Sequence, residues 1–270
     1  MRSEVEAHES ETPTPVDAKR SRSLRDLTFL RPALQQIQRL FTLAGFTLTY
    51  ARVSGIRDAE LYRPFLQPWN APEWRRLLRN GDSHSLVPLE AKYILYTVLL
   101  DALVNCEGAV AECGVYKGGT AIIMADLAAK FGRSLHLFDT FAGMPKTRNE
   151  KDLHKEGDFD DTTLPAVKAY LGERSNVTFH PGLIPGTLAT VADKTFAFVH
   201  IDLDIYDSVL AAVTFFYPRL ASGGQIVFDD YGYPSCPGAR AAVDDFFRGR
   251  NDALLTLSTG QCVVRKPVKA

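Results

Sequence analysis

Short apolar runs alternate with amphipathic stretches from Ala109 to the end of the sequence, and this alternation restricts the fold. Five of the apolar runs are typical of buried strands, and they lie at 109–112, 135–139, 177–180, 196–202 and 225–229. The stretches between and after them are typical of helices, at 120–131, 164–171, 206–217 and 239–247. Apolar strands separated by helices form a parallel sheet that is covered on both faces.

The C-terminal segment predicts two further strands. Residues 254–257 and 262–265 are strand-like runs joined through Gly260, as in a hairpin. Together with the five earlier runs they make seven strands. We therefore predict an α/β fold with a Rossmann-like sheet that is mostly parallel, with an antiparallel last strand and a helical N-terminal cap.

The N-terminal third differs from the rest of the chain. Residues 1–26 are polar and predict a disordered tail. Residues 27–84 predict a cap made of helix and loop: apolar residues recur at helical spacing over 27–52, and Trp69 and Trp74 require burial. The amphipathic helix offers a surface for packing on the main domain or on a second copy of the chain, which favours a homodimer or a higher homo-oligomer. Residues 85–270 then form the main domain.

Composition and charge restrict the partners and the compartment. The chain has 31 Lys and Arg against 32 Asp and Glu, and this balance argues against nucleic-acid binding. No apolar run is long enough for a transmembrane span, and the polar N-terminus does not resemble a signal peptide. The four cysteines form no C-x-x-C pair, which argues against zinc and thioredoxin chemistry. We expect a soluble, cytoplasmic protein with reduced cysteines.

A glycine-rich turn follows the first predicted strand and opens a helix, from Glu112 to Thr120. Ligands of open α/β sheets bind at the carboxyl ends of the strands, and an acid that ends the next strand, here Asp139, can hold a ribose. Glu112 would repel the pyrophosphate of a dinucleotide but suits a cationic amino acid, so S-adenosylmethionine is favoured. The plainer alternatives are that Glu112 caps a turn and that Asp139 solvates a strand end.

Four aspartates lie at the ends of two predicted strands that should be neighbours. Asp202 ends one of these strands and Asp204 follows it, and Asp229 ends the other and Asp230 follows it. Adjacent strands lie about 4.8 Å apart, so these carboxylates should lie close together and repel one another. Oxygen ligands without His or Cys favour Mg²⁺ or Ca²⁺. A single aspartate here would more often be a turn residue, whereas His200 is best interpreted as a satisfied strand histidine.

Several motifs, in this order, resemble the macrocin O-methyltransferase family (the TylF, MycF and NovP type). They are ECGVYKGGT at 112–120, DTFAGMP at 139–145, GDF at 157–159, HIDLDIYDS at 200–208, DDY at 229–231, PG at 237–238 with AVDDF at 242–246, and GQ at 260–261 with Lys266. The resemblance covers about residues 84–268. It implies a class I methyltransferase that uses S-adenosylmethionine and a divalent metal, usually Mg²⁺.

The same resemblance assigns roles to individual residues. Asp202, Asp229 and Asp230 would be metal ligands, and Asp204 would be the general base. Glu112 would contact the methionine part of the cofactor and Asp139 its ribose, and the cofactor site as a whole would contain Glu112, Gly114, Tyr116, Gly118, Gly119, Thr120, Asp139 and Phe141.

The implied reaction is methyl transfer to a hydroxyl of a deoxysugar on a natural product or glycoconjugate. Residues 1–83 do not clearly match the antibiotic-tailoring members, so the acceptor stays open. A catechol-type acceptor would also chelate the metal. A nicotinamide-dependent oxidoreductase and a non-catalytic binding module are the alternatives from other classes, but neither gives the four aspartates a purpose.

Overall fold

The computed structural model describes residues 68–268. The predicted disordered tail (1–26) and the predicted helix over 27–52 lie outside these residues. Residues 53–67 of the predicted cap lie outside them too, and the part of the cap that the structure describes is helical: η2 (Pro68–Asn70) leads into α2 (Pro72–Leu78) and η3 (Arg79–His84). Trp74 packs edge-on against Tyr93 and Tyr96, at ring-centroid distances of 4.9 and 5.1 Å.

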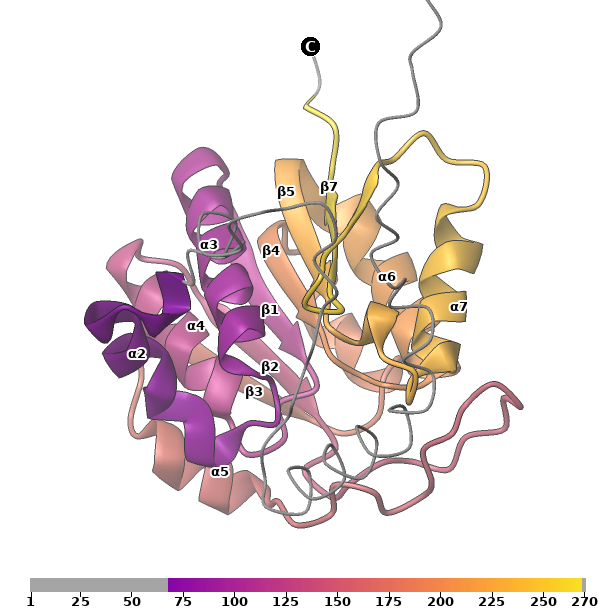
Figure 1. Ribbon diagram of the computed structural model, residues 1–270, viewed down its shortest axis with the longest axis horizontal. Helices are drawn as coiled ribbons and strands as arrows, with labels where there is room; N and C mark the ends of the chain where they lie inside the picture. Colours follow the sequence, from indigo (N-terminus) through magenta and orange to yellow (C-terminus); the bar gives the residue numbers. More distant parts are fainter. Residues whose placement is uncertain (1–67, 269–270) are drawn as a thin grey trace, which may run out of the picture. The chain divides into compact units, whose positions relative to one another are not determined.

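A seven-stranded sheet forms the centre of the domain, as predicted (Figure 1). Its order is β3-β2-β1-β4-β5-β7-β6. The four pairings from β3 to β5 are parallel, and β7 runs antiparallel to both of its neighbours. The strands are β1 (Ala109–Cys113), β2 (Leu135–Asp139), β3 (Val177–Pro181), β4 (Phe196–Ile201), β5 (Leu220–Phe228), β6 (Leu254–Thr256) and β7 (Cys262–Arg265).

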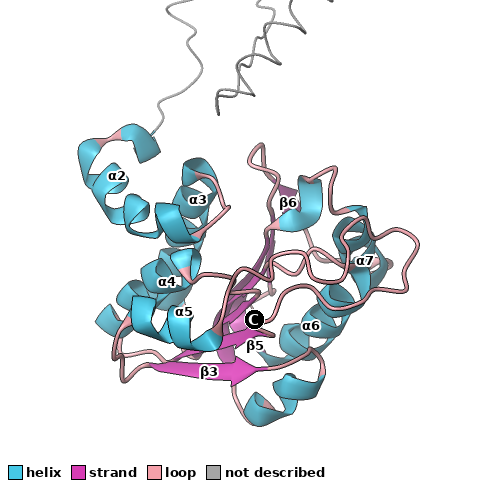
Figure 2. Cartoon of the chain, turned by 90° about the horizontal axis from the view of Figure 1, so that it is seen from below, coloured by secondary structure: helices cyan, strands magenta, loops and turns pink. Residues whose placement is uncertain are grey.

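Helices cover both faces of this sheet, because its central strands are apolar on both sides. On one face α3 (Leu89–Asn105), α4 (Gly119–Lys130) and α5 (Leu164–Leu171) bury one core with residues such as Leu99 and Met124. On the other face α6 (Tyr206–Arg219) and α7 (Pro237–Phe247) bury a second core with residues such as Val213 and Phe216. Figure 2 shows the two helix groups on opposite sides of the strands. Short 3-10 segments, η4 (Gly186–Val191) and η5 (Asp230–Gly232), complete the domain.

The structure differs from the sequence prediction at β5. This strand begins at Leu220 instead of residue 225, and the register with β4 shifts between Phe196 and Phe198. Gly223, with φ +79°, lies within the strand at this irregularity. Asp202 and Asp229 follow the last residues of β4 and β5, so both aspartates lie at the carboxyl edge of the sheet.

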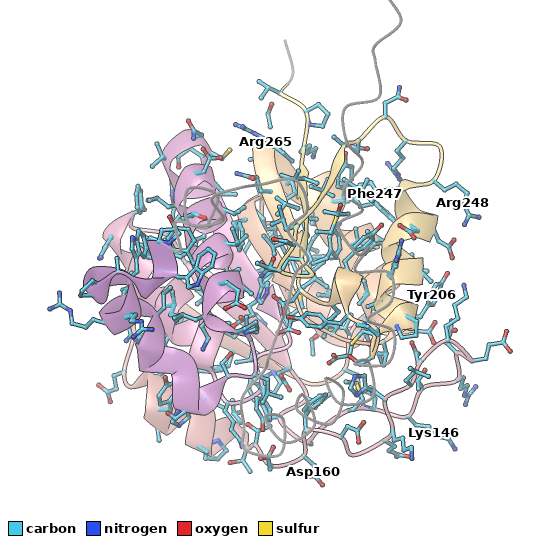
Figure 3. All side chains as sticks on the ribbon, viewed as in Figure 1. Lys146, Asp160, Tyr206, Phe247, Arg248 and Arg265 are labelled. Atoms are coloured by element: carbon cyan, nitrogen blue, oxygen red, sulfur yellow. The ribbon has the colours of Figure 1, made fainter. Side chains whose placement is uncertain are left out.

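One long connection runs along this carboxyl edge. Residues 140–163 join β2 to α5 without regular structure. Figure 3 shows Lys146 and Asp160 on the outer side of this loop, and both are exposed. Long loops of this kind usually serve binding or catalysis. Among residues 68–268, no helix combines the length and the hydropathy that a membrane span requires.

Candidate active site

A cavity of about 280 Å³ opens where β1, β2, β4 and β5 end. This is the edge at which parallel α/β sheets bind their ligands. Eight of the predicted site residues line it: Gly114, Tyr116, Thr120, Asp139, Asp202, Asp204, Asp229 and Asp230. Four others lie nearby without lining it: Glu112, Gly118, Gly119 and Phe141.

Asp139 fastens two loops at one side of the cavity. Its Oδ2 accepts hydrogen bonds from the backbone N–H groups of Val115, at 2.7 Å, and Tyr116, at 2.9 Å. Its Oδ1 accepts from Phe141 N at 2.7 Å. Tyr116 and Phe141 both have positive φ, near 50°, which costs free energy for residues with a side chain. The carboxylate therefore holds the glycine turn and the following loop in a strained conformation.

The glycines of the turn are required by packing within the protein. A Cβ on Gly114 would lie 1.6 Å from the carbonyl oxygen of Asp202, so only glycine allows the end of β1 to contact the end of β4 there. A Cβ on Gly118 would lie 2.6 Å from Leu171 Cδ1 in α5. The turn thus holds the segment after β1 against the first aspartate of the acidic group.

Glu112 and His200 are register partners on the adjacent strands β1 and β4. Both side chains are fully buried, and His200 Nδ1 lies 3.0 Å from Glu112 Oε1. His200 Nε2 lies 3.4 Å from Asp229 Oδ1. Burial alone would lower the pKa of His200, but the hydrogen bonds to Asp229 and Glu112 outweigh it and raise this pKa to about 9. His200 therefore links the two carboxylates, and both of its contacts favour the protonated imidazole.

Two further atoms lie at the ends of these buried contacts between Glu112, His200 and Asp229. Gln261 Nε2 donates to Asp229 Oδ1 at 2.8 Å, so this oxygen faces two donors. Glu112 Oε2, in contrast, is buried and has no hydrogen-bond partner among residues 68–268. A buried carboxylate oxygen without a donor is costly, so this atom marks a place where a ligand or a water can donate.

Three of the four predicted aspartates form a compact group. Ligand oxygens of Asp202, Asp204 and Asp230 lie within 4.8 Å of one another. We call these three residues the carboxylate cluster. Asp230 Oδ2 also accepts from the backbone N–H groups of Leu203, at 3.1 Å, and Asp204, at 2.9 Å. Of the three predicted metal ligands, Asp202 and Asp230 belong to the cluster, whereas Asp229 faces His200 and Gln261 from the same cavity.

Burial and mutual repulsion determine the charge state of the cluster. Burial raises the pKa of Asp202 well above its usual range, and the neighbouring carboxylates of Asp230 and Asp229 raise it further. Asp230 is affected in the same direction, by burial and then by Asp204 and Asp229. Burial also raises the pKa of Asp204. Such a group of carboxylates is suited to accepting protons or to binding a cation.

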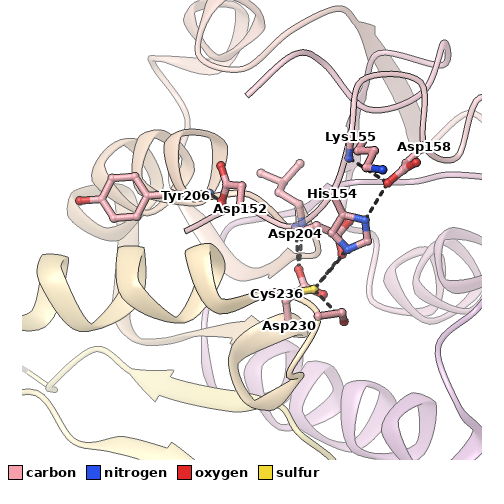
Figure 4. A network of polar contacts seen from close by, with 10 residues as sticks. Asp152, His154, Lys155, Asp158, Asp204, Tyr206, Asp230 and Cys236 are labelled. Carbon is pink, nitrogen blue, oxygen red and sulfur yellow. Dashed lines mark hydrogen bonds and ion pairs between the residues drawn. The ribbon is translucent and has the colours of Figure 1, made fainter. Parts of the chain in front are cut away.

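The sequence reasoning missed two residues beside Asp204, as Figure 4 shows. Cys236 Sγ donates to Asp204 Oδ1 at 3.3 Å, and His154 Nε2 lies 3.6 Å from the same oxygen. Both line the cavity. His154 lies in the long loop after β2, and Cys236 immediately precedes α7, so the sequence places both in segments that follow strands of the sheet but does not bring them beside Asp204.

Comparison with known proteins agrees with the motifs. A family model described as macrocin O-methyltransferase (TylF) matches residues 95–256. The 8-demethyl-8-(2,3-dimethoxy-alpha-L-rhamnosyl)-tetracenomycin-C 4'-O-methyltransferase of Streptomyces olivaceus is 32% identical over 187 residues, which are 62% of this chain and 69% of that enzyme. The mycinamicin III 3''-O-methyltransferase of Micromonospora griseorubida is 30% identical over 155 residues, and the match spans 52% of this chain and 60% of that enzyme.

Solved structures show the same fold. The O-methyltransferase NovP superposes with a TM-score of 0.61 at 25% identity, over 68% of this chain and 82% of that chain. The calicheamicin methyltransferase CalS11 shares the fold with a TM-score of 0.56 at 20% identity, over 80% of this chain and 99% of that chain. The family match covers more than half of the sequence and includes the strands that end at the cavity. The chain therefore belongs to the macrocin O-methyltransferase family and is an O-methyltransferase.

Proposed function

We propose that this enzyme transfers a methyl group from S-adenosylmethionine to a sugar hydroxyl of a natural product or glycoconjugate, with a divalent cation bound beside the acceptor. The observation that carries the proposal is a juxtaposition within one cavity. A turn fastened by Asp139 lies on one side, and the carboxylate cluster lies on the other. The first arrangement suits a nucleoside donor and the second suits a metal-assisted acceptor.

The cofactor assignment is supported by the hydrogen-bonding capacity left at β1 and β2. Asp139 Oδ2 already accepts two backbone hydrogen bonds and Oδ1 accepts one at short distance. A carboxylate has about four acceptor positions, so Oδ1 keeps room for a ribose hydroxyl. The unpartnered Oε2 of Glu112 can accept from a cationic amino acid, directly or through a water. The remaining predicted cofactor residues position these two groups.

The cation assignment is supported by the chemistry of the donors. The cluster offers carboxylate oxygens only, at separations that one ion can bridge. Hard oxygen ligands favour Mg²⁺. Asp229, fixed by Gln261 and His200, lies beside the cluster in the same cavity and is the third ligand proposed. When bound, the cation lowers the pKa of the acceptor hydroxyl.

Asp204 is the proposed general base. Its carboxylate takes the hydroxyl proton while the acceptor oxygen forms its bond to the methyl carbon and the bond from that carbon to sulfur breaks. Burial raises the pKa of this carboxyl group toward the range that suits a base near neutral pH. The Cys236 thiol donates to Oδ1 and so fixes the orientation of the carboxylate. Alignment of oxygen, carbon and sulfur within the cavity would supply much of the rate.

The acceptor class is inferred from the relatives. Those already described are named for a rhamnosyl-tetracenomycin and for mycinamicin III. The demethyldecarbamoylnovobiocin O-methyltransferase of Streptomyces niveus is 28% identical over 156 residues.

We place the enzyme in the cytoplasm, since all four cysteines are free thiols and a reducing compartment keeps them so.

A two-part experiment tests the proposal. Calorimetry with S-adenosylhomocysteine and with NAD identifies the cofactor class, and we expect binding of the former alone. A methyl-transfer assay against deoxysugar glycosides and catechols, with Mg²⁺ or with EDTA, identifies the acceptor and the metal requirement. We expect transfer to glycosides that EDTA abolishes. Binding of NAD, or transfer that persists in EDTA, would contradict the cofactor or the metal assignment respectively.

A further inference from the structure

Three different ligand atoms form a nearly equilateral triangle at one side of the cavity (Figure 4). Cys236 Sγ lies 3.3 Å from Asp204 Oδ1 and 3.6 Å from His154 Nε2. His154 Nε2 lies 3.6 Å from Asp204 Oδ1. We call these three residues the His–Cys–Asp face. They come from the loop after β2, the loop after β4 and the segment before α7, so the fold assembles the face from three connections.

The size of this triangle matches one ion in particular. Bonds of about 2.0–2.3 Å at a tetrahedral angle place the ligand atoms of zinc roughly 3.3–3.6 Å apart. All three separations on the His–Cys–Asp face fall in this range. A cation can therefore bind at the triangle with little movement of the protein atoms.

The histidine is oriented as metal ligands usually are. Its second nitrogen, Nδ1, lies 3.1 Å from Asp158 Oδ2, and this oxygen also accepts from Lys155 N at 2.9 Å. A carboxylate on the far nitrogen fixes the ring and the tautomer of a metal-binding histidine. With Nδ1–H donated to Asp158, the lone pair of Nε2 points to Cys236 and Asp204.

The donor set differs from that of the carboxylate cluster. Sulfur and imidazole nitrogen favour zinc and similar cations, whereas carboxylate oxygens favour magnesium. Cys236 is buried, whereas the side chains of His154 and Asp204 are 17% and 18% exposed. All three residues nevertheless line the cavity, which leaves a fourth coordination position accessible to water or to a ligand.

We propose that His154, Cys236 and Asp204 form a binding site for a thiophilic divalent cation such as Zn²⁺. This site differs from the carboxylate cluster but shares Asp204 with it. Binding forms a bond from the cation to sulfur, and the thiol proton leaves to solvent. His154 binds through its neutral Nε2 and Asp204 through Oδ1. The fourth ligand is water.

The shared aspartate gives the site a consequence for activity, which rests on the function proposed above. A cation on the His–Cys–Asp face occupies Asp204, so this residue can no longer take the acceptor proton. Zn²⁺ should therefore inhibit methyl transfer even when Mg²⁺ is saturating. Cys236→Ser should lower the sensitivity to Zn²⁺ by at least about tenfold, because the hard hydroxyl is a poor substitute for thiolate.

Cobalt spectroscopy tests the site without reference to activity. The full-length protein, stripped with EDTA, dialysed and supplied with saturating Mg²⁺, is titrated with Co²⁺ under a non-coordinating reductant. We expect one equivalent to produce a thiolate-to-cobalt charge-transfer band and the intense visible bands of four-coordinate cobalt, both removed by Zn²⁺. Cys236→Ser should lose the charge-transfer band. Cys106→Ser, a change at a thiol far from the face, should keep it.

Two further variants test the other ligands if Cys236→Ser folds poorly. His154→Ala keeps the thiol but should weaken cobalt binding by tenfold or more. Asp158→Asn should weaken it by about 10–100-fold, the usual effect of losing the carboxylate behind a ligating histidine. No band in the parent protein, a band that persists in Cys236→Ser, or unchanged affinity in His154→Ala would overturn the site. A Cys236-dependent band in a protein without methyl transfer would keep the site and reject the proposed function.

Discussion

The two sides of the cavity use the same functional group in opposite ways. At the end of β2, Asp139 accepts three short hydrogen bonds from backbone N–H groups, and its charge is satisfied by the fold itself. At the ends of β4 and β5, the carboxylates of the cluster face one another, and burial together with repulsion raises the pKa values of Asp202 and Asp230. The Asp139 carboxylate is held in place by the fold without a ligand, whereas the carboxylate cluster becomes favourable only with a proton or a cation.

This difference indicates that the two sides have different roles, cofactor binding on the Asp139 side and cation binding at the carboxylate cluster. A fastened turn can bind a cofactor without rearrangement, so the entropy of ordering it is already included in folding. A cluster of repelling carboxylates stores unfavourable free energy that a bound cation releases. Changes on the Asp139 side should therefore affect stability first, and changes on the cluster side should affect chemistry first.

The largest expected effect is on catalysis at Asp204. Asp204→Asn removes the proposed proton acceptor while keeping the size of the side chain, so kcat should fall by about 10²–10⁴-fold. Affinity for S-adenosylhomocysteine should stay unchanged, because the cofactor side is intact. Single-turnover kinetics and calorimetry measure the two quantities. Asp207→Asn, at an exposed residue in the same segment, is the matched control, and a near-normal rate in Asp204→Asn would show that another group is the base.

The next largest effect is on stability at Asp139. Asp139→Ala leaves the N–H groups of Val115, Tyr116 and Phe141 without their acceptor, so the free energy of unfolding should fall by roughly 3 kcal/mol. Denaturant titration measures this change. Asp161→Ala provides the control, since Asp161 contacts Tyr116 from the exposed side and should lower the free energy of unfolding far less. Equal losses in both variants would contradict the idea of a fastened turn.

Most of the fold could be predicted from the sequence, because the periodicity of apolar residues and the positions of turn residues are local properties of the chain. The bounds of β2, α5 and β7 match the predicted ranges, since each lies between clear turn residues. The start of β5 was predicted five residues late because Gly223 and Gly224 interrupt the apolar run, whereas the structure places them within an irregular strand. Glycine marks an unusual backbone conformation without saying whether it lies in a loop or in a strand.

Only the site residues that lie at the ends of strands could be placed together from the sequence. Asp202 and Asp230 could be placed together because parallel neighbours end at the same edge of a sheet. His154 and Cys236 could not, because their proximity to Asp204 depends on how two irregular segments fold over that edge. The partnership of Glu112 with His200 needed the register of β1 and β4, which no local pattern contains.

The effect of Asp202→Asn on stability should change sign when Mg²⁺ is added, which would distinguish the carboxylate cluster from the Asp139 side. Asp202→Asn removes one charge from the cluster, so in EDTA the variant should be more stable than the parent protein by about 1 kcal/mol. With Mg²⁺ at about 100 times the parent dissociation constant, the parent should gain about 2.7 kcal/mol and the variant much less. Unfolding titrations with and without Mg²⁺ measure both. Asp126→Asn, on α4, is the control, and a loss in Asp202→Asn that is the same under both conditions would contradict a cation at the cluster.

The smallest expected effect concerns His136, a buried histidine of the sheet outside the site. It shows how much of the pH dependence of stability comes from the sheet and how much from the site carboxylates. His136 on β2 is buried, and its Nδ1 lies 3.0 Å from Nε2 of His180 on β3. Burial, His180 and Lys194 together lower the pKa of His136 to about 4, against a smaller opposing effect of Asp193. The unfolded value lies near 6.5, so this stabilisation is present above that pH and is lost as the pH falls from there toward 4. The loss should reach about 2 kcal/mol by about pH 5. His136→Gln, which does not titrate, should flatten the dependence of the unfolding free energy on pH between about pH 7 and pH 5, as denaturant titrations at each pH would measure. If the slope stayed the same, acid would act on other groups, and the site carboxylates would be the next to test.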